Sequence, residues 1–542
     1  MCGIYLYFSN ENKDLDLRKH INNIEQIKKR GPDNLIINNL PYCILAFQRL
    51  SIINKNFNGN QPFYQINRSN GNQTYLICNG EIYNYLDLQK KYIRNQNIKS
   101  DCEILLSLYN KFTFEQFCEI MENEILGEYA FCIVEYDRNN ILLNIISGRD
   151  HLGIRPLFYS KNVFSSNLKS IKNFSETKQY PPGIICMYNL KKDEKKNYDI
   201  CRKIYLTKQI IDYDDIYLYN IRKALINAVD IRLNIDIDKI GFLLSGGLDS
   251  SLICAIASSL TKEKIKTFSI GIKNESTDLE NAKIVSEHLQ CNHTVVYFTK
   301  DEIIKIIEDV IECIESYDIT TVRASIGNYL ISKYISDNTE IKVVMSGEVS
   351  DELTSGYLFN WFCPYDKINE TVHEYLKNIH YYDGLRCDRT ISDHGLEARI
   401  PFSDIIFIKE YLKIPEYKRH PTYGNIEKYF LRQAFYGVGL LPEEILFRRK
   451  EAFSDGVSSK ENSLFEIIQN YCNIKYQDLN HNEVTNEAYH YKKIFTEKFG
   501  EKNVDIIPGY WKHKYTKDGL LDKYHDPSAR TLHPKDLINK NI

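Results

Sequence analysis

Cysteine is the second residue of the chain, in the segment Met1-Cys2-Gly3-Ile4. The small side chain at position 2 favours removal of Met1, which leaves a thiol and a free α-amine on one residue. Such an amine has a pKa of about 7.7 to 8.0, close to the working pH, and the thiolate is the attacking form of a cysteine nucleophile. Cys2 is therefore a candidate nucleophile that carries its own base. The alternative is an ordinary buried cysteine.

A second set of chemically capable residues forms the small-residue loop Ser245–Ser251. It follows the apolar run Ile240–Leu244, which predicts a buried strand, and it precedes an apolar helix. Small residues let the backbone wrap an anion, and the helix N-terminus supplies unpaired N–H groups. The loop predicts a phosphate site, although it lacks the Gly-Lys-Ser/Thr ending used for γ-phosphoryl transfer. A strand-to-helix turn without a ligand is the alternative.

A third segment, Ser346–Glu352, follows the apolar run 342–345 in the same manner. The carboxyl ends of parallel strands face one crevice, so the two loops are expected to meet. Asp249 and Asp351 could then share a Mg²⁺ ion that neutralises polyphosphate charge. The alternative is that both acids only cap helix N-termini.

Two kinds of element must position these residues. Residues 1 to about 190 are rich in predicted strands, with helices expected at 17–29 and 101–111 and a surface hairpin or linker at 191–198. From about residue 215, helices alternate with single buried strands, which predicts a doubly wound parallel sheet. The predicted strands are 75–78, 130–134, 141–146, 240–244, 266–270 and 342–345.

Composition bounds the class of protein. A chain of 542 residues is long for one core, so two or more domains are expected. The net charge of −3 gives no electrostatic case for nucleic acid or an anionic membrane as partner. Neither a membrane-spanning run nor a signal-peptide core is apparent, so a cytosolic protein is expected. The 14 cysteines contain no CxxC pair and are interpreted as free thiols.

In their order along the chain, these motifs and others resemble the glutamine-hydrolysing asparagine synthetases. The resemblance implies an α+β part, residues 2–190, with the αββα Ntn-hydrolase-type fold of class II glutamine amidotransferases. It also implies an α/β part, residues 215–542, with a doubly wound ATP-pyrophosphatase domain and a helical extension. The motifs are Met1–Ile4, Arg30–Asp33, Arg49–Ile52, Asn79–Asn84, Ser100–Glu103, Gly148–Leu157, Pro181–Gly183, Ser245–Ser251, Tyr317–Ser325, Ser346–Glu352, Leu396–Phe402 and Arg449–Gly456.

For the first domain, the resemblance implies that Cys2 attacks the side-chain amide of glutamine, releasing ammonia and leaving a glutamyl thioester. Asn79 and the backbone of Gly80 correspond to the oxyanion hole, which stabilises a tetrahedral intermediate by several kcal/mol. Arg49 corresponds to the group that holds the substrate α-carboxylate. The other implied glutamine-binding residues are Glu81 and Asp101 at the α-ammonium, and the backbone of Leu50 and Ile52.

For the second domain, the resemblance implies that aspartate attacks the α-phosphorus of ATP to give β-aspartyl-AMP and diphosphate. Glu348 corresponds to an acid that takes a proton from attacking ammonia. Lys450 corresponds to a lysine that balances phosphate charge, and Thr320 and Arg323 correspond to residues around the α-phosphate. The implied ATP-binding residues are Leu244, Ser245, Gly246, Gly247, Asp249, Ser250, Ile270, Ser346 and Gly347, and Asp249 and Asp351 are the implied Mg²⁺ ligands.

The sequence departs from the family pattern at Phe47-Gln48, at Asn54 and at Val349, which replaces a glycine. We expect negative φ at Val349, with the side chain turned away from the phosphates, because β-branched residues disfavour positive φ. Glutamine, aspartate and ATP are the expected small-molecule partners, with internal ammonia transfer and with a homodimer left open. Two alternatives remain: another amide-forming synthetase on the same two domains, and a homologue that has lost turnover.

Overall fold

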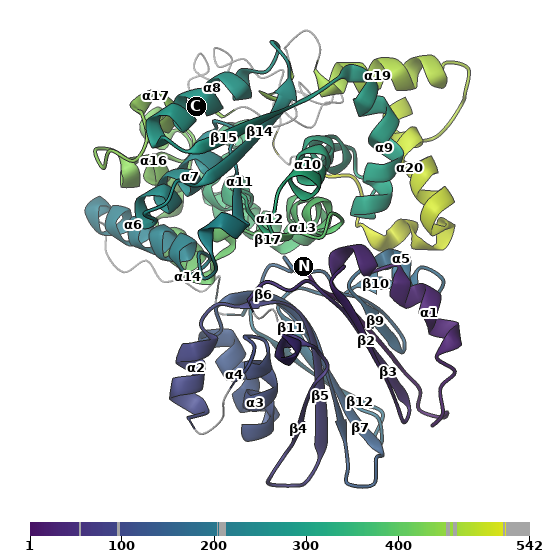
Figure 1. Cartoon of the computed structure of the whole chain (residues 1–542). Helices are drawn as coiled ribbons and strands as arrows, with labels where there is room; N and C mark the ends of the chain where they lie inside the picture. Colours follow the sequence, from purple (N-terminus) through teal and green to yellow (C-terminus); the bar gives the residue numbers. More distant parts are fainter. Residues whose placement is uncertain are drawn as a thin grey trace. The chain divides into compact units, whose positions relative to one another are not determined.

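Two structural units make up the chain in the computed structural model, which describes residues 1–53, 56–94, 98–202, 204, 213–450, 456–458, 463–512 and 515. The first unit contains Met1–Leu206 and Ser392–Glu397, and the second contains Thr207–Ile391 and Ala398–Ile542. Figure 1 colours both by position in the chain. Asn54 lies outside the described residues.

Two antiparallel sheets form the middle of the first unit, in the orders β10-β8-β9-β1-β3-β2 and β12-β11-β7-β6-β5-β4. The strands of the first sheet are β1 (Gly3–Phe8), β2 (Asn34–Leu40), β3 (Cys43–Arg49), β8 (Phe158–Ser160), β9 (Val163–Ser165) and β10 (Lys178–Gln179). Those of the second sheet are β4 (Phe63–Ile66), β5 (Gln73–Ile82), β6 (Gly127–Tyr136), β7 (Leu142–Arg149), β11 (Ile184–Asn189) and β12 (Glu194–Asp199). The charged run predicted as a hairpin or linker is the β11–β12 hairpin.

Helices cover the outer faces of both sheets, which gives the αββα arrangement predicted for this unit (Figure 1). Along β6, Cys132 and Val134 enter the core between the sheets, whereas Phe131 and Ile133 enter the core beneath the helices. Because successive strand residues face opposite sides, a strand covered on both sides is a continuous apolar run. The helices are α1 (Arg18–Glu25), α2 (Tyr85–Tyr92), α3 (Glu103–Lys111), α4 (Phe114–Asn123) and α5 (Leu168–Ile171).

A short later segment, Ser392–Glu397, completes the first unit. The carboxylate of Asp393 forms ion pairs with Lys29 at 2.7 Å and with Lys169 at 3.1 Å. The backbone carbonyl of Leu396 accepts a hydrogen bond from the Met1 α-amine at 3.0 Å. This unit is therefore assembled from two separate stretches of sequence.

A five-stranded sheet in the order β15-β14-β13-β16-β17 forms the centre of the second unit. Its strands are β13 (Ile240–Leu243), β14 (Lys266–Ile272), β15 (Asn292–Phe298), β16 (Val343–Met345) and β17 (Glu397–Arg399). β13 pairs in parallel with both β14 and β16. The chain builds outward from β13 to β15 and then returns to place β16 on the other side of β13. This reversal is the switch point at which doubly wound sheets bind ligands, and the predicted doubly wound sheet is confirmed.

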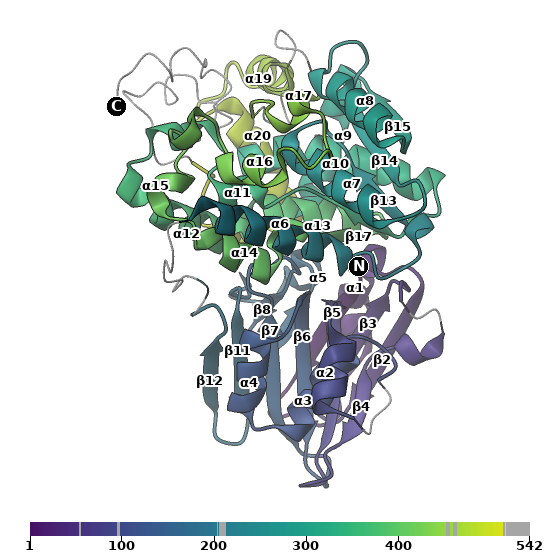
Figure 2. The same ribbon diagram turned by 90° about the vertical axis from the view of Figure 1, so that its left-hand side faces the viewer.

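Helices surround this sheet, with α7 and α8 along one face and α10 along the other (Figures 1 and 2). They are α6 (Asp214–Asp230), α7 (Leu248–Leu260), α8 (Thr277–Leu289), α9 (Lys300–Ile314), α10 (Ile319–Asn338), α11 (Ser350–Thr354), α12 (Ile368–Asn378), α13 (Asp383–Ser392), α14 (Ile405–Leu412), α15 (Glu416–Arg419), α16 (Tyr429–Phe435), α17 (Glu443–Leu446), α19 (Leu464–Lys475) and α20 (Asn486–Phe499). The helices from α12 onward form the predicted helical extension.

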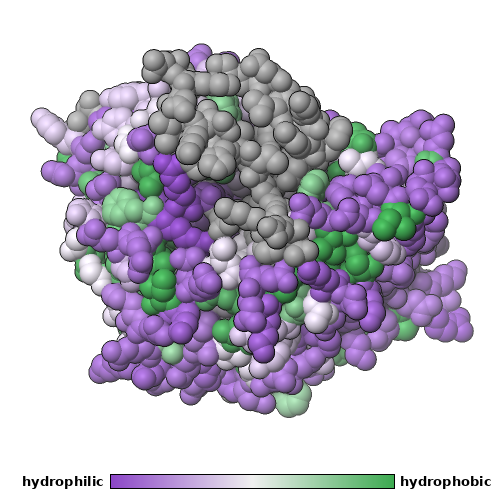
Figure 3. Space-filling model, turned by 90° about the horizontal axis from the view of Figure 1, so that it is seen from above, coloured by the Kyte–Doolittle hydropathy of each residue, from purple (hydrophilic) through white to green (hydrophobic). Residues whose placement is uncertain are grey.

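The cysteines are all free thiols, as the sequence predicts. Within the described residues, no helix is both long enough and apolar enough to cross a membrane. Figure 3 shows one face on which hydrophilic residues cover most of the coloured area, with hydrophobic residues in separate spots.

Candidate active sites

Cys2 immediately precedes β1, and its half-buried thiol faces Leu50, the residue that follows β3. The backbone N–H of Leu50 points at Cys2 Sγ, with N and S 3.5 Å apart. Burial raises the pKa of the Cys2 thiol to about 11. In the chain with Met1 present, the nitrogen of Cys2 is a peptide amide, and burial lowers the pKa of the Met1 α-amine to about 5. The dual role of Cys2 thus requires the loss of Met1, which stays a prediction.

Asn79 and Arg30 hold the backbone of Cys2. In the amide orientation that satisfies its hydrogen bonds, the Asn79 nitrogen donates to the Cys2 carbonyl at 2.8 Å and its oxygen accepts from Arg30 at 3.3 Å. Arg30 Nε donates to the same carbonyl at 3.0 Å. Asn79 therefore lies beside the nucleophile, and Gly80 follows it on β5.

The predicted glutamine-holding residues come from three elements of the first unit. Arg49, the last residue of β3, donates from Nη1 to the Asn56 carbonyl and to Asn60 Oδ1, both at 2.7 Å. Asp101 Oδ2 accepts a hydrogen bond at 2.9 Å from the backbone N–H of Ile82, the residue that follows Glu81 on β5. Of the two backbone positions expected to line the pocket, Leu50 is buried and Ile52 is half-buried.

In the second unit, the Ser245–Ser251 loop joins β13 to α7 as expected. Ser245 Oγ and Ser250 Oγ are 2.9 Å apart, and the N–H of Gly247 donates to Ser245 Oγ at 3.3 Å. Gly246, between them, has φ +74°. The backbone therefore curls around its own hydroxyls at a helix N-terminus, the geometry of an anion cradle.

The Ser346–Glu352 loop meets the first loop at the end of β16. A Cβ atom at Gly347 would lie 2.8 Å from the backbone nitrogen of Ser250, so only glycine permits this approach. Together the loops border a cavity of about 200 Å³. The predicted residues that line this cavity are Leu244, Ser245, Gly247, Asp249, Ser250, Ile270, Thr320, Ser346, Gly347, Glu348, Asp351 and Lys450.

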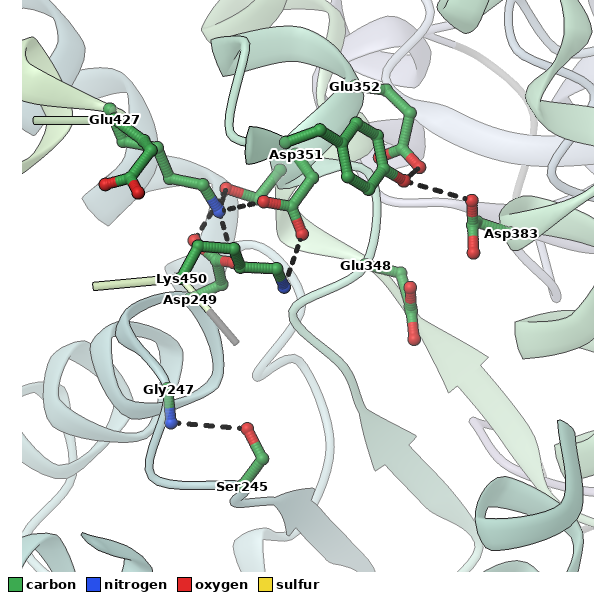
Figure 4. A network of polar contacts seen from close by, with 12 residues as sticks. Ser245, Gly247, Asp249, Glu348, Asp351, Glu352, Asp383, Glu427 and Lys450 are labelled. Carbon is green, nitrogen blue, oxygen red and sulfur yellow. Dashed lines mark hydrogen bonds and ion pairs between the residues drawn. The ribbon is translucent and has the colours of Figure 1, made fainter. Parts of the chain in front are cut away.

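Glu348 occupies the part of the cavity near Asp383, apart from the group formed by Asp249, Asp351 and Lys450 (Figure 4). Burial raises the pKa of Glu348 to about 7, Arg386 opposes this rise and Asp383 adds to it. A carboxylate with this pKa can accept a proton near neutral pH.

Two ammonium groups neutralise the pair of aspartates. Lys428 Nζ is 2.5 Å from Asp249 Oδ2 and 2.6 Å from Asp351 Oδ1, and Lys450 Nζ is 2.7 Å from Asp351 Oδ2. Although burial alone raises the pKa of Asp351, the two lysines lower it well below its usual range. Asp351 Oδ1 is buried, and its charged partner is Lys428 Nζ. Two carboxylates on adjacent loops offer the oxygen ligands that fit a Mg²⁺ ion carried by a polyphosphate.

Val349 contradicts the sequence-based expectation. Its φ is +75° and its ψ is −18°, in the left-handed region, and its side chain is buried. The expectation of negative φ was wrong because Val349 precedes α11 at the N-cap, where this loop requires a left-handed residue. A β-branched side chain there carries strain on the order of 1–3 kcal/mol.

The structure separates two residues that the sequence places together. Thr320 lines the cavity, and its buried Oγ1 finds no hydrogen-bond partner among the described residues. Arg323 is absent from the cavity lining in the described part of the chain and pairs with Glu487 of α20 at 2.5 Å, with both side chains buried. The structure therefore does not place Arg323 in the lining of the cavity that the two loops border.

The cavity residues that the sequence analysis missed include three charged ones: Asp383, Arg386 and Lys428. None lies in a glycine-rich loop or beside a predicted strand end. In the sequence, each of these residues is only a charged residue in a partly apolar helical segment. Such residues are usually solvated, so the sequence does not indicate that they line a site.

The comparisons with known proteins agree with this geometry. The chain matches the asparagine synthase family model over residues 220–364 and 360–517, and the glutamine amidotransferase domain model over residues 1–205. It is 36% identical to the glutamine-hydrolysing asparagine synthetase of Bos taurus over 581 residues, covering 98% of each chain. The Gallus gallus protein of that name is 36% identical over 588 residues, covering 100% of each. A probable asparagine synthetase of Acanthamoeba polyphaga mimivirus is 35% identical over 570 residues, covering 98% of this chain and 100% of that one. The chain therefore belongs to the family of glutamine-hydrolysing asparagine synthetases.

Proposed function

We propose that this protein converts aspartate, glutamine, ATP and water into asparagine, glutamate, AMP and diphosphate. The observation that carries the proposal is the cavity in which two phosphate-facing loops, Lys450 and a carboxyl group with a pKa near 7 meet. A cysteine with a half-buried thiol near the start of the same chain supplies the means to release ammonia from glutamine.

At the first site, we propose that the Cys2 thiolate attacks the glutamine amide carbon, expelling ammonia and leaving a thioester that water then hydrolyses. The α-amine freed by loss of Met1 takes the thiol proton. Asn79 and Gly80 stabilise the oxyanion, and Arg49 holds the α-carboxylate. Glu81 and Asp101 hold the α-ammonium, with the backbone of Leu50 and Ile52 beside it.

At the second site, we propose that the N–H groups and hydroxyls of the Ser245–Ser251 loop hold the diphosphate part of ATP while aspartate attacks the α-phosphorus. Lys450 balances charge on the leaving diphosphate. A Mg²⁺ ion held by Asp249 and Asp351 supplies further neutralisation when bound. Glu348 then accepts a proton as ammonia displaces AMP from β-aspartyl-AMP. Thr320 offers to the same cavity a buried hydroxyl that has no hydrogen-bond partner among the described residues, whereas the buried pair with Glu487 supports a structural role for Arg323.

Three further features belong to the proposal. The glutaminase domain spans residues 2–190 and the synthetase domain spans residues 215–542. Ammonia passes internally from the first site to the second. The enzyme is cytoplasmic, binds neither nucleic acid nor membrane, and has a homodimer as its simplest assembly.

One assay with separate readouts tests this function. Purified protein is supplied with aspartate, ATP, Mg²⁺ and glutamine, and asparagine, glutamate and diphosphate are quantified. Equal amounts of asparagine and diphosphate are expected. Diphosphate without asparagine would favour another amide-forming synthetase, and no diphosphate would indicate a homologue without turnover.

A further inference from the structure

Lys428 is a deeply buried charged residue that lines the nucleotide cavity, and no part of the proposed reaction uses it. Its side chain is 2% exposed, and its Nζ contacts Asp249, Asp351 and, at 3.4 Å, the Ser350 hydroxyl. The first two contacts join carboxylates from the two different phosphate loops. Lys428 thus ties these loops together (Figure 4 shows the loops' carboxylates).

Two features of the backbone accommodate the buried Lys428 side chain. Lys428 has φ +59° and ψ +31°, a left-handed conformation that costs a non-glycine residue about 1–2 kcal/mol. A Cβ atom at Gly356 would lie 2.2 Å from both Lys428 Cε and Asp351 Oδ1, so the glycine leaves room for the lysine stem. Strained backbone of this kind persists where the surrounding structure demands it, commonly at functional sites.

The position of Nζ is also the position that a divalent cation would need. A cation that bridges Asp249 and Asp351 must contact oxygens of both carboxylates, and Mg²⁺ does so at about 2.0–2.1 Å. Lys428 Nζ already lies 2.5 and 2.6 Å from one oxygen of each. The ammonium and a bridging cation therefore exclude one another unless Lys428 moves.

A displaced ammonium group needs a new anion, because an unpaired buried charge is costly. The cavity that Lys428 lines is the one proposed to hold the polyphosphate of ATP. When nucleotide and cation enter together, phosphate oxygens replace the carboxylates as partners of Lys428. When the cation enters alone, no replacement is present.

We propose that Lys428 competes with the divalent cation for Asp249 and Asp351 in the nucleotide-free enzyme, and becomes a phosphate-binding residue when the cation enters with ATP. Lys428 then couples the two ligands: the cation binds weakly alone and tightly with the nucleotide. The phosphate half of this inference rests on the proposed ATP-cleaving function, whereas competition for the carboxylates does not.

Binding of Mn²⁺, a spectroscopic probe in place of Mg²⁺, tests the inference by electron paramagnetic resonance. Affinity is measured on the full chain, with and without α,β-methylene-ATP, which the enzyme cannot cleave. We expect the analogue to tighten Mn²⁺ binding to the unchanged protein by roughly tenfold or more. In Lys428→Met, Mn²⁺ without nucleotide should bind roughly tenfold tighter than in the unchanged protein, and the effect of the analogue should largely disappear.

Lys418→Met is the matched control, because Lys418 is a buried lysine that pairs with Asp214 at 2.7 Å and lies outside the cavity lining. It should leave both Mn²⁺ affinities unchanged. If Lys428→Met does not fold, Lys428→Arg is used instead, because it keeps the positive charge. The planar guanidinium of arginine should hold both carboxylates more firmly, so Mn²⁺ should bind more weakly without nucleotide.

Unchanged Mn²⁺ affinity in a folded Lys428→Met protein, or in Lys428→Arg, would overturn the inference. Diphosphate–ATP exchange is measured in parallel on the unchanged protein. Exchange with no Lys428 effect on Mn²⁺ contradicts this inference alone, whereas absent exchange contradicts the proposed function.

Discussion

Arg386 donates from Nη2 to Glu348 Oε2 at 2.7 Å and from Nε to Asp383 Oδ1 at the same distance. One guanidinium therefore joins the proposed proton acceptor to a second carboxylate. Burial raises the pKa of Glu348, Arg386 lowers it and Asp383 raises it, with a net value of about 7. The two neighbours act in opposite directions on one group, which makes their roles separable.

Substitution of these neighbours should shift the pH profile of asparagine synthesis in opposite directions. Glu348 must be ionised to accept a proton, so synthesis should fall below about pH 7, where the carboxyl protonates. Arg386→Gln removes the group that lowers this pKa and should move the fall to higher pH. Asp383→Asn removes a group that raises it and should move the fall to lower pH. The measurement is asparagine formed per glutamate released, across pH; shifts of the same sign would contradict the assignment.

Cys2→Ala should abolish glutamine-dependent asparagine formation and leave ammonia-dependent formation, because the thiol belongs only to the first site. Retention of Met1 should have the same effect, since the Cys2 nitrogen is then an amide. Both reactions are followed by asparagine production with glutamine or ammonium chloride. Cys186→Ala, which removes another half-buried thiol of the same unit, is the control. Glutamate release by the Cys2 variant would refute the nucleophile assignment.

Asp249→Asn and Asp351→Asn should each slow aspartate-dependent diphosphate–ATP exchange by roughly a hundredfold, about 2.7 kcal/mol of barrier. Each loses a carboxylate proposed to help neutralise phosphate charge through Mg²⁺. Glutamine hydrolysis should continue in both. Asp215→Asn, at an exposed carboxylate of α6, should change neither activity. Loss of both activities in a folded variant would argue against independent sites.

At position 349, we expect the glycine variant to be more stable than the alanine variant, the reverse of the usual order. In a helix or strand, glycine normally makes the folded protein less stable than alanine does, by about 0.5–1 kcal/mol. Glycine, however, tolerates positive φ, whereas alanine does not. We therefore expect Val349→Gly to unfold at a higher temperature than Val349→Ala, with φ +75° as the cause. Diphosphate release should also quicken in Val349→Gly, by up to about tenfold, as strain beside Glu348 and Asp351 is relieved. A lower melting temperature than that of the alanine variant would show that the backbone is not strained.

Local pattern was enough to predict the doubly wound sheet of the second unit and the loops that follow β13 and β16, whereas the αββα arrangement of the first unit was predicted from the family resemblance. The run Ile240–Leu244 followed by small residues predicts its own strand, turn and helix, and β13, the loop and α7 confirm it. Neighbouring residues set these features, so they are visible in a short stretch of sequence.

Pairs that are distant in sequence could not be predicted in this way. Arg323 lies in a motif of the family, yet its partner Glu487 is 164 residues away. Lys428 and Asp249 are 179 residues apart, and a lone lysine has no local signal that it will be buried. The backbone at Val349 was predicted wrongly because residue preference was weighed without the loop geometry that overrides it.

Because Ser392–Glu397 belongs to the first unit, the two units cannot be separated by a single cut in the sequence. A gene fragment that ends at Leu206 would encode a first unit without the Leu396 carbonyl that receives the Met1 amine, and without Asp393, which neutralises two lysines. In such a fragment, Lys29 and Lys169 would both lose the carboxylate that they share in the native unit. An independently expressed glutaminase would therefore need these few residues grafted back, for example through a flexible linker.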